Sequence, residues 1–233
     1  MIDGDIALIT GAGRGIGRAT AEAFAAEGYT VVLAELRAAL GRTAARALAK
    51  KGRRAVFVRT DVASRLSIHR TVSGVFSRFK RLDCLVNNAG VLTAGALAGL
   101  RGRDLDRMLA VNLRGPLLVT RAALPGMLRQ RAGSIINVAS QLGKVGAGEY
   151  ATYCASKFGL VGFTEALAEE LTGTGVRVWA VCPGLVDTPM ARQAGVSRAE
   201  RHHLIRPESV AQVILDLAMG RRRANSGSAV DVE

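Results

Sequence analysis

The stretch that decides the fold reads Ile6-Ala7-Leu8-Ile9-Thr10-Gly11-Ala12-Gly13-Arg14-Gly15-Ile16-Gly17. An apolar run comes first, a glycine-rich turn follows it, and an Ala-rich helical segment begins directly after the turn. Glycines let the backbone bend sharply and approach a pyrophosphate, and the free N–H groups of a helix N-terminus attract its charge. A glycine-rich turn can be purely structural, but its place between a strand and a helix predicts a dinucleotide-binding site. The coenzyme-binding residues predicted in this turn are Gly11, Gly13, Arg14, Gly15, Ile16 and Gly17.

The rest of the chain alternates short, β-branched apolar runs with longer helical patterns. Several of the runs are apolar throughout, which is typical of parallel strands covered on both faces. The predicted strands are Ile6–Thr10, Thr30–Glu35, Ala55–Thr60, Leu82–Asn87, Ser134–Ala139, Val176–Val181 and Ala229–Val232. The predicted helices are Gly15–Glu27, Ala38–Lys51, Ser64–Lys80, Arg103–Gln130, Ala151–Thr172 and Pro207–Gly220. This β-α repeat predicts an α/β fold with a doubly wound parallel sheet.

Glu35 ends the second predicted strand, 24 residues after Gly11. A carboxylate there accepts hydrogen bonds from ribose hydroxyls and repels a 2′-phosphate, which favours NAD. Arg14 and Arg37 indicate the opposite, because either guanidinium could bind the extra phosphate of NADP, although Arg14 could instead pair with Glu35. We give the carboxylate more weight, because charge repulsion excludes NADP whereas a nearby arginine only tolerates it. NAD is the favoured coenzyme and NADP is the alternative.

The composition is that of one globular domain. Of 233 residues, 49% are hydrophobic and 4% aromatic, which suits Ala-, Val- and Leu-rich helices packed on a sheet. No apolar run reaches the roughly 18 residues of a membrane span, and the N-terminus lacks the basic stretch of a secretory signal. Cys84, Cys154 and Cys182 are widely spaced within apolar stretches, which indicates reduced core thiols. We expect a cytoplasmic protein with no metal site.

The net charge of +13 could attract nucleic acid or an acidic partner. The basic residues are scattered along the chain, and the tightest run is Arg221-Arg222-Arg223. No aromatic residues accompany that run to stack on bases. The charge therefore indicates a solvated surface, and no specific nucleic acid is expected as a partner.

Tyr153 and Lys157 lie four residues apart on a predicted helix, so their side chains share one face. A free phenol has a pKa of about 10, and a neighbouring ammonium lowers it towards useful acid–base chemistry. Ser140 follows a predicted strand, where side chains at the strand ends face the ligand crevice. Tyr150 is also close but has no lysine one turn later. The pair alone is weak evidence, and with Ser140 it predicts a catalytic constellation.

Together with these residues, further motifs resemble the short-chain dehydrogenase/reductase family over nearly the whole chain. In the order of the family, they are Thr10-Gly11-x-x-x-Gly15-x-Gly17, Asp61-Val62, Asn87-Asn88-Ala89-Gly90, Asn112, Ser140, Tyr153-x-x-x-Lys157 and Pro183-Gly184. The chain is similar to the 3-oxoacyl-carrier-protein reductases of that family. The resemblance implies one Rossmann domain over residues 1–233, with helices on both faces of a seven-stranded sheet in the order 3-2-1-4-5-6-7. It also implies an oxidoreductase that transfers a hydride between NAD or NADP and a ketone or secondary alcohol.

The resemblance assigns a role to each motif. Tyr153 exchanges a proton with the substrate oxygen, Ser140 positions that oxygen, and Lys157 binds the nicotinamide ribose and lowers the pKa of Tyr153. Asn112 holds a water that relays protons from Lys157 to solvent. The implied coenzyme contacts are Asp61 and Val62 at adenine, Asn88, Ala89 and Gly90 at its ribose, and Pro183, Gly184, Val186 and Thr188 at the nicotinamide, together with Tyr153 and Lys157.

The spacing of Asn112 and Pro116 has a physical interpretation of its own. Proline has no N–H to bond the carbonyl four residues earlier, so within one helix over Arg103–Gln130 the Asn112 carbonyl would be free to bind a water. The alternative is that Pro116 only kinks the helix. Both hypotheses stay open at this point.

The substrate end is less well determined. Residues expected to face the substrate are mostly apolar and suit a ketone with a hydrocarbon body: Leu92, Thr93, Ser140, Gln141, Leu142, Val145, Tyr150, Leu185 and Met190. A short lid is predicted at about residues 188–206, where the neighbouring His202 and His203 are expected to be solvated rather than metal ligands. The chain also lacks the Gly-Gly tail of many relatives after its last strand, which puts in doubt any subunit contact made by the tail.

Three further expectations concern partners and alternatives. The resemblance implies a homodimer or homotetramer built on Arg103–Gln130 and Ala151–Thr172, although the small residues Gly159, Gly162 and Ala166 could equally pack inside a monomer. Arg129 and Arg131 are placed where an acidic carrier protein could dock. The alternatives to an enzyme are a non-catalytic nucleotide-binding regulator and a basic nucleic-acid-binding protein.

Overall fold

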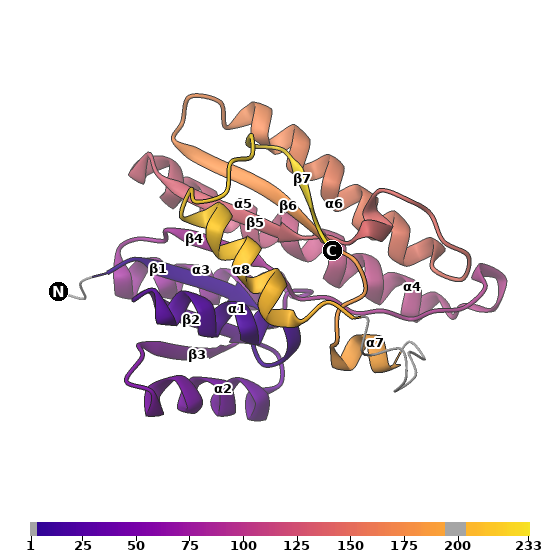
Figure 1. The fold of residues 1–233 in the computed structure, drawn as a ribbon, viewed down its shortest axis with the longest axis horizontal. Helices are drawn as coiled ribbons and strands as arrows, with labels where there is room; N and C mark the ends of the chain where they lie inside the picture. Colours follow the sequence, from indigo (N-terminus) through magenta and orange to yellow (C-terminus); the bar gives the residue numbers. More distant parts are fainter. Residues whose placement is uncertain (1–3, 194–203) are drawn as a thin grey trace.

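The computed structural model describes residues 4–193 and 204–233 and contains a seven-stranded parallel sheet in the order β3-β2-β1-β4-β5-β6-β7 (Figure 1). The strands are β1 (Ile6–Thr10), β2 (Thr30–Glu35), β3 (Ala55–Arg59), β4 (Cys84–Asn87), β5 (Gly133–Val138), β6 (Val176–Pro183) and β7 (Ala229–Val232). The predicted Rossmann topology and strand order are confirmed. The crossover between β3 and β4 reverses the winding next to β1, and this switch point is where open α/β sheets bind ligands.

Helices cover both faces of the sheet. They are α1 (Gly15–Ala26), α2 (Ala38–Lys50), α3 (Arg65–Phe79), α4 (Gly102–Leu109), α5 (Gly115–Gln130), α6 (Ala151–Glu170), α7 (Pro189–Gln193) and α8 (Pro207–Ala218), with short helical turns η1 (Leu97–Gly99), η2 (Ala110–Arg114) and η3 (Gln141–Gly143). Phe24, Leu48 and Ile214 bury one face under α1, α2 and α8. Helices α3 and α5 lie on the other face, behind the sheet in Figure 1. Burial on both faces explains why β1 and β2 are apolar without alternation.

The predicted helix Arg103–Gln130 is helical throughout but contains one π turn, η2, between α4 and α5. Within η2 the Gly115 N–H donates to the Ala110 carbonyl, five residues earlier. Pro116 follows at the start of α5, so the wider turn lies where proline removes a backbone donor. The π turn is the local difference from the expected continuous α-helix.

A row of buried polar side chains joins the two central strands to α5 and α6. The Asn87 amide donates to Thr120 and to Asn137, both at 2.9 Å. The Asn137 amide in turn donates to Thr164 at 2.9 Å. Buried amides need such partners, because an unpaired one would cost about 1–3 kcal/mol. The row therefore sets how both helices lie on the sheet.

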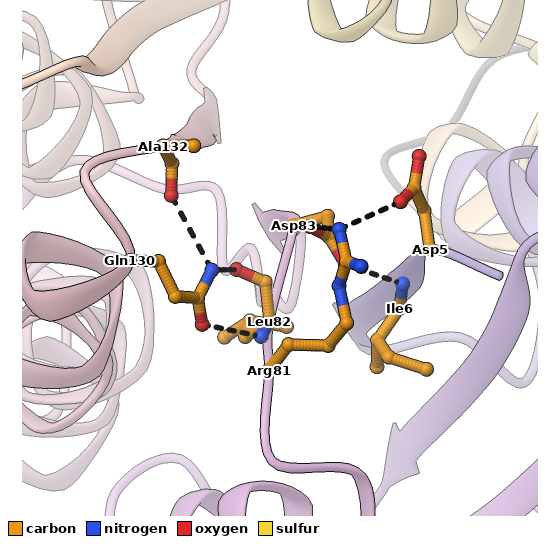
Figure 2. A network of polar contacts seen from close by, with 7 residues as sticks. All are labelled: Asp5, Ile6, Arg81, Leu82, Asp83, Gln130 and Ala132. Carbon is orange, nitrogen blue, oxygen red and sulfur yellow. Dashed lines mark hydrogen bonds and ion pairs between the residues drawn. The ribbon is translucent and has the colours of Figure 1, made fainter. Parts of the chain in front are cut away.

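The amino ends of the strands are tied together by polar contacts (Figure 2). Arg81 binds both Asp83 and Asp5, and Asp83 accepts the Ile6 N–H. Gln130, at the end of α5, both donates to and accepts from the backbone of Leu82. These contacts hold the sheet together at the amino ends of its strands. The cleft opens at the opposite, carboxyl ends.

Cys84, Cys154 and Cys182 are all buried and form no disulfide with one another, as predicted for reduced core thiols. Over residues 4–193 and 204–233, no helix is long and apolar enough to cross a membrane. Within that same part of the chain, no cluster of three or more His, Cys, Asp or Glu side chains could hold a metal ion.

Candidate active site

A cleft of about 890 Å³ runs along the carboxyl ends of the strands, from the turn after β1 to the segment after β6. With four exceptions, every residue predicted to bind coenzyme or substrate, or to act in catalysis, lines this cleft. The exceptions are Gly13, Gly17, Thr93 and Asn112, which lie outside its lining. The cleft has a β2 end, with Arg14, Glu35 and Arg37, and a β5 end, with Ser140, Tyr153 and Lys157.

The glycine-rich turn needs glycine for close packing as well as for its backbone angles. Gly11 has a φ of +65°, a left-handed conformation that glycine adopts without strain. A Cβ atom on Gly17 would collide with the carbonyl oxygen of Gly11, and one on Gly13 would lie 2.9 Å from Glu35 Oε2. Gly13 and Gly17 thus shape the turn from behind, while Gly11, Gly15 and Ile16 form the wall of the cleft.

Glu35 lies at the β2 end and is 4% exposed. Its carboxylate accepts the Gly13 N–H at 3.1 Å and the Arg37 N–H at 3.0 Å. Glu35 forms an ion pair with Arg37, whose Nε lies 3.5 Å from Glu35 Oε1. The alternative pairing of Glu35 with Arg14 is not the one in the structure. Burial and the neighbouring Arg37 lower the pKa of Arg14, and Glu35 opposes them. The β2 end therefore holds one fixed carboxylate and two guanidinium groups.

The segment after β4 is tied to the glycine-rich turn. The Asn88 amide donates to the carbonyls of Thr10 and Gly11, at 2.9 and 3.2 Å. The backbone N–H groups of Asn88 and Ala89 both bond the Thr10 hydroxyl. The side chain of Asn88 therefore shapes the cleft wall as well as lining it.

Tyr153 and Ser140 face each other at the β5 end. Ser140 follows β5 and Tyr153 lies in the first turn of α6, so two distant segments bring the pair together. Burial raises the pKa of Tyr153 to about 12, and a hydrogen bond with Ser140 opposes that rise. The Ser140 hydroxyl also accepts the Leu142 N–H at 3.1 Å, which fixes its position.

Lys157 lies one turn after Tyr153, as the spacing predicted, and is 4% exposed. Its Nζ donates to the Val138 carbonyl at 2.7 Å and lies 5.6 Å from the centroid of the Tyr153 ring. Burial lowers the pKa of Lys157 to about 8. In this arrangement burial dominates the pKa of Tyr153, and the lowering of that pKa by Lys157 stays a prediction.

Asn112 occupies the π turn and is completely buried. Its side chain pairs with the backbone of Val91 through two hydrogen bonds of 2.8 Å, one to the N–H and one to the carbonyl. The amide also donates to Ser156 at 3.3 Å. The binding of a water by the Asn112 carbonyl stays a prediction, and no sequence motif indicated the bonds of its side chain.

The walls between the two ends are mostly apolar. Of the residues expected to face substrate, all but Thr93 line the cleft, and the Thr93 N–H instead contacts the Met108 sulfur. Sequence reasoning missed lining residues such as Val91, Val111 and Arg107. Val91 and Val111 adjoin quoted motifs and could have been found there, whereas nothing in the sequence singles out Arg107.

The predicted lid is only partly described. Pro189–Gln193 forms α7, and Met190 lines the cleft. After the gap, Ile205 pairs with Val186 in an isolated parallel bridge, so the chain returns to the cleft wall before α8 begins. His202 and His203 lie outside the described residues.

Comparison with known proteins places this geometry in a family. The family model for short chain dehydrogenases matches residues 5–199. This chain is a short-chain dehydrogenase. It is 38% identical to a 3-oxoacyl-[acyl-carrier-protein] reductase of Thermotoga maritima, over all of this chain and 97% of the relative. It is also 38% identical to galactitol 2-dehydrogenase of Agrobacterium fabrum, over 80% of this chain and 72% of the relative.

A solved structure shows the same fold. The crystal structure of levodione reductase superposes with a TM-score of 0.92 at 27% identity, and the match covers 98% of this chain and 96% of the other. As a short-chain dehydrogenase, the chain is an NAD(P)-dependent oxidoreductase acting on an alcohol or ketone. These relatives give no support to the alternatives of a non-catalytic regulator or a nucleic-acid-binding protein.

Proposed function

We propose that this short-chain dehydrogenase interconverts a ketone and a secondary alcohol with Tyr153 as the acid–base. The nicotinamide coenzyme, when bound, supplies or accepts the hydride, and Tyr153 supplies or accepts the proton on the substrate oxygen. The observation that carries the proposal is that Ser140, Tyr153 and the buried Lys157 line one stretch of the cleft, although Ser140 follows β5 and the other two lie on α6. A phenol with a pKa of about 12 remains protonated at neutral pH, which suits proton donation to the oxygen of a ketone.

The other groups at the β5 end support this chemistry. Ser140 holds the substrate oxygen beside Tyr153. Lys157, with a pKa near 8, exchanges protons readily in the neutral range and sits within the cleft wall next to Val138. The Asn112 carbonyl is proposed to hold a water between Lys157 and solvent, since Pro116 removes the donor four residues later.

The residues around the cleft fit a dinucleotide. Gly11 and Gly15 line the cleft at the glycine-rich turn and have no side chain to block a pyrophosphate, and the N-terminus of α1 follows the turn directly. Asp61, Val62, Asn88, Ala89 and Gly90 would hold the adenosine part. The strand-end segment with Pro183, Gly184, Val186 and Thr188 would hold the nicotinamide.

NAD is proposed as the preferred coenzyme. In support, Glu35 is buried and lines the cleft, and its two backbone hydrogen bonds prevent it from turning away. A 2′-phosphate placed there would meet a fixed negative charge. Arg14 and Arg37 line the same end and favour NADP, so the preference rests on the balance between Glu35 and these cations.

The substrate is proposed to be a ketone or alcohol with an apolar body, since Leu92, Leu142, Val145, Leu185 and Met190 line the β5 half of the cleft. A relative named as an acyl-carrier-protein reductase makes a carrier-linked substrate worth testing. Arg129 and Arg131 are exposed but precede β5, whereas Ser140 follows it. A carrier docked on these arginines would therefore have to span the length of the strand within one subunit.

We further propose a homodimer or homotetramer in the cytoplasm. Gly162 and Ala166 are exposed on α6, and a Cβ on Gly162 would meet open space. Gly159 instead packs against Leu113 within the chain. Two of the three small residues are thus available for a close helix contact between subunits.

The test is a fluorescence screen of ketones and alcohols with both NADH and NADPH. Wild-type protein should oxidise the reduced coenzyme with at least one ketone, and Tyr153→Phe should bind coenzyme without turnover. Turnover by Tyr153→Phe at the wild-type rate would overturn the acid–base assignment.

A further inference from the structure

Ser156 lies between the two residues of the Tyr153–Lys157 pair but takes no part in lining the cleft. It is 0% exposed and belongs to the buried side of α6. Its hydroxyl donates to the Tyr153 carbonyl at 2.7 Å and accepts from the Asn112 amide at 3.3 Å. One oxygen atom therefore joins the first turns of α6 to the π turn η2.

The connection continues to the wall of the cleft. The Asn112 side chain bonds both backbone groups of Val91, and Val91 lines the cleft directly after Asn88-Ala89-Gly90. Ser156 and Asn112 together link the helix that carries Tyr153 to the segment that would hold the coenzyme ribose. Tyr153 and Val91 lie 62 residues apart in sequence, so only the fold brings them together.

The Ser156 hydroxyl is well suited to this link because it donates and accepts at the same time. The Asn112 amide has two N–H groups, and they donate to the Val91 carbonyl and to the Ser156 hydroxyl. A hydroxyl that donates one bond becomes a better acceptor for the next, so the two bonds reinforce each other. In a buried site, loss of the oxygen would leave an amide hydrogen without its acceptor.

We propose that Ser156 is a positioning residue for the reaction, which holds Tyr153 in place relative to the coenzyme-binding segment through Asn112 and Val91. Ser156 touches neither substrate nor coenzyme, and it acts through the backbone of Tyr153. The inference rests on the acid–base role proposed for Tyr153.

Thr164 provides a matched control on the same helix. Its hydroxyl is also 0% exposed, donates to the Leu160 carbonyl at 2.7 Å and accepts from the Asn137 amide at 2.9 Å. The two sites have the same chemistry, but Thr164 is linked to β5 rather than to Asn112 and Val91. Ser156→Ala and Thr164→Val each remove one hydroxyl and little else.

The experiment compares unfolding temperature, coenzyme Kd, kcat and the pH profile of alcohol oxidation for both variants. Both should lower the unfolding temperature and keep coenzyme binding. Ser156→Ala alone should lower kcat, by about tenfold, as expected when a reacting group is slightly misplaced. Its kcat profile should also move to higher pH, because a displaced Tyr153 loses part of the Ser140 hydrogen bond that favours the phenolate.

Equal kcat values and equal pH profiles for Ser156→Ala and Thr164→Val would overturn the positioning role. If Ser156→Ala fails to fold, Ser156→Cys replaces it, because a thiol has similar bulk and is a much weaker hydrogen-bonding group. Its kcat and pH profile are then compared with those of Thr164→Val in the same way. Tyr153→Phe is assayed in parallel. Full turnover by that variant would overturn the acid–base role itself, whereas an inactive Tyr153→Phe beside an unaffected Ser156→Ala would overturn only the inference about Ser156.

Discussion

At the β2 end of the cleft, Glu35 is bound by Arg37 and by two backbone N–H groups, whereas at the β5 end Lys157 is bound by the Val138 carbonyl. The first arrangement keeps opposite charges together beside solvent, with the Arg37 side chain 49% exposed. The second removes a lone ammonium from water, and its pKa falls. Charge at the β2 end can select between ligands, while burial at the β5 end tunes proton transfer. The two ends should therefore respond differently to substitution and to pH.

The largest effect is expected at the β5 end, from Tyr153→Phe. Loss of the phenol hydroxyl should lower kcat by roughly two to four orders of magnitude, the usual contribution of a positioned acid–base group. Coenzyme Kd should stay near the wild-type value, because the ring still fills its place. Tyr150→Phe is the control: Tyr150 lines the same cleft, so its change should affect KM more than kcat. A comparable loss of kcat in both variants would contradict the assignment to Tyr153.

The second prediction uses the pH dependence of stability. The folded-state pKa of Lys157, about 8, lies below its ordinary value of 10.5, so burial of its charge destabilises the fold below pH 8. As pH rises from 8 towards 10.5, the folded protein loses this proton first and stability increases. Relative to Lys157→Met, the wild type should gain on the order of 1–3 kcal/mol across this window. Tyr29 and Tyr153, whose pKa values are both raised to about 12, lower the stability of both proteins above pH 10, so their effect cancels in this difference.

Urea denaturation at pH 7 to 10 measures this difference. A constant gap between the two proteins over that range would show that Lys157 keeps an ordinary pKa in the fold. The β2 end offers a contrast, since Glu35→Gln should leave the stability change between pH 8 and 10 unaltered.

A smaller effect is expected from Glu35→Gln on coenzyme choice. Removing the negative charge while keeping an acceptor for one N–H should raise the kcat/KM ratio of NADPH to NADH by about tenfold, or about 1.4 kcal/mol. Arg14→Leu should shift the ratio the other way, because it removes a cation that could bind the 2′-phosphate. An unchanged ratio in Glu35→Gln would mean that the carboxylate serves the glycine-rich turn, through Gly13, and not coenzyme selection.

The smallest effect is expected outside both ends of the cleft. Arg129→Ala with Arg131→Ala should leave kcat/KM for a small ketone unchanged, because both residues precede β5 while the reacting groups follow it. If an acidic carrier docks there, KM for a carrier-linked substrate should rise several-fold, because the variant loses a few charge contacts at the surface. Unchanged kinetics with both substrates would dismiss this docking site.

The order of elements was readable from the sequence because it depends on local pattern. Apolar runs without alternation, the glycine-rich turn after Thr10 and the four-residue spacing of Tyr153 and Lys157 each act over a few residues. These features predicted the alternation of strands and helices, both ends of the cleft and the shared face of the catalytic pair, whereas the strand order in the sheet was implied by the family resemblance. The burial of Leu160 and Leu167, seven residues apart on α6, is the pattern that a helical period produces.

Only the tertiary structure decided what surrounds each group. The direction of the Tyr153 pKa depends on burial, and the bonds from Asn112 to Val91 and Ser156 join segments far apart in the sequence. Spacing along a helix determines which face a side chain occupies. Desolvation and long-range hydrogen bonds depend on how helices and strands pack, and no local pattern specifies that.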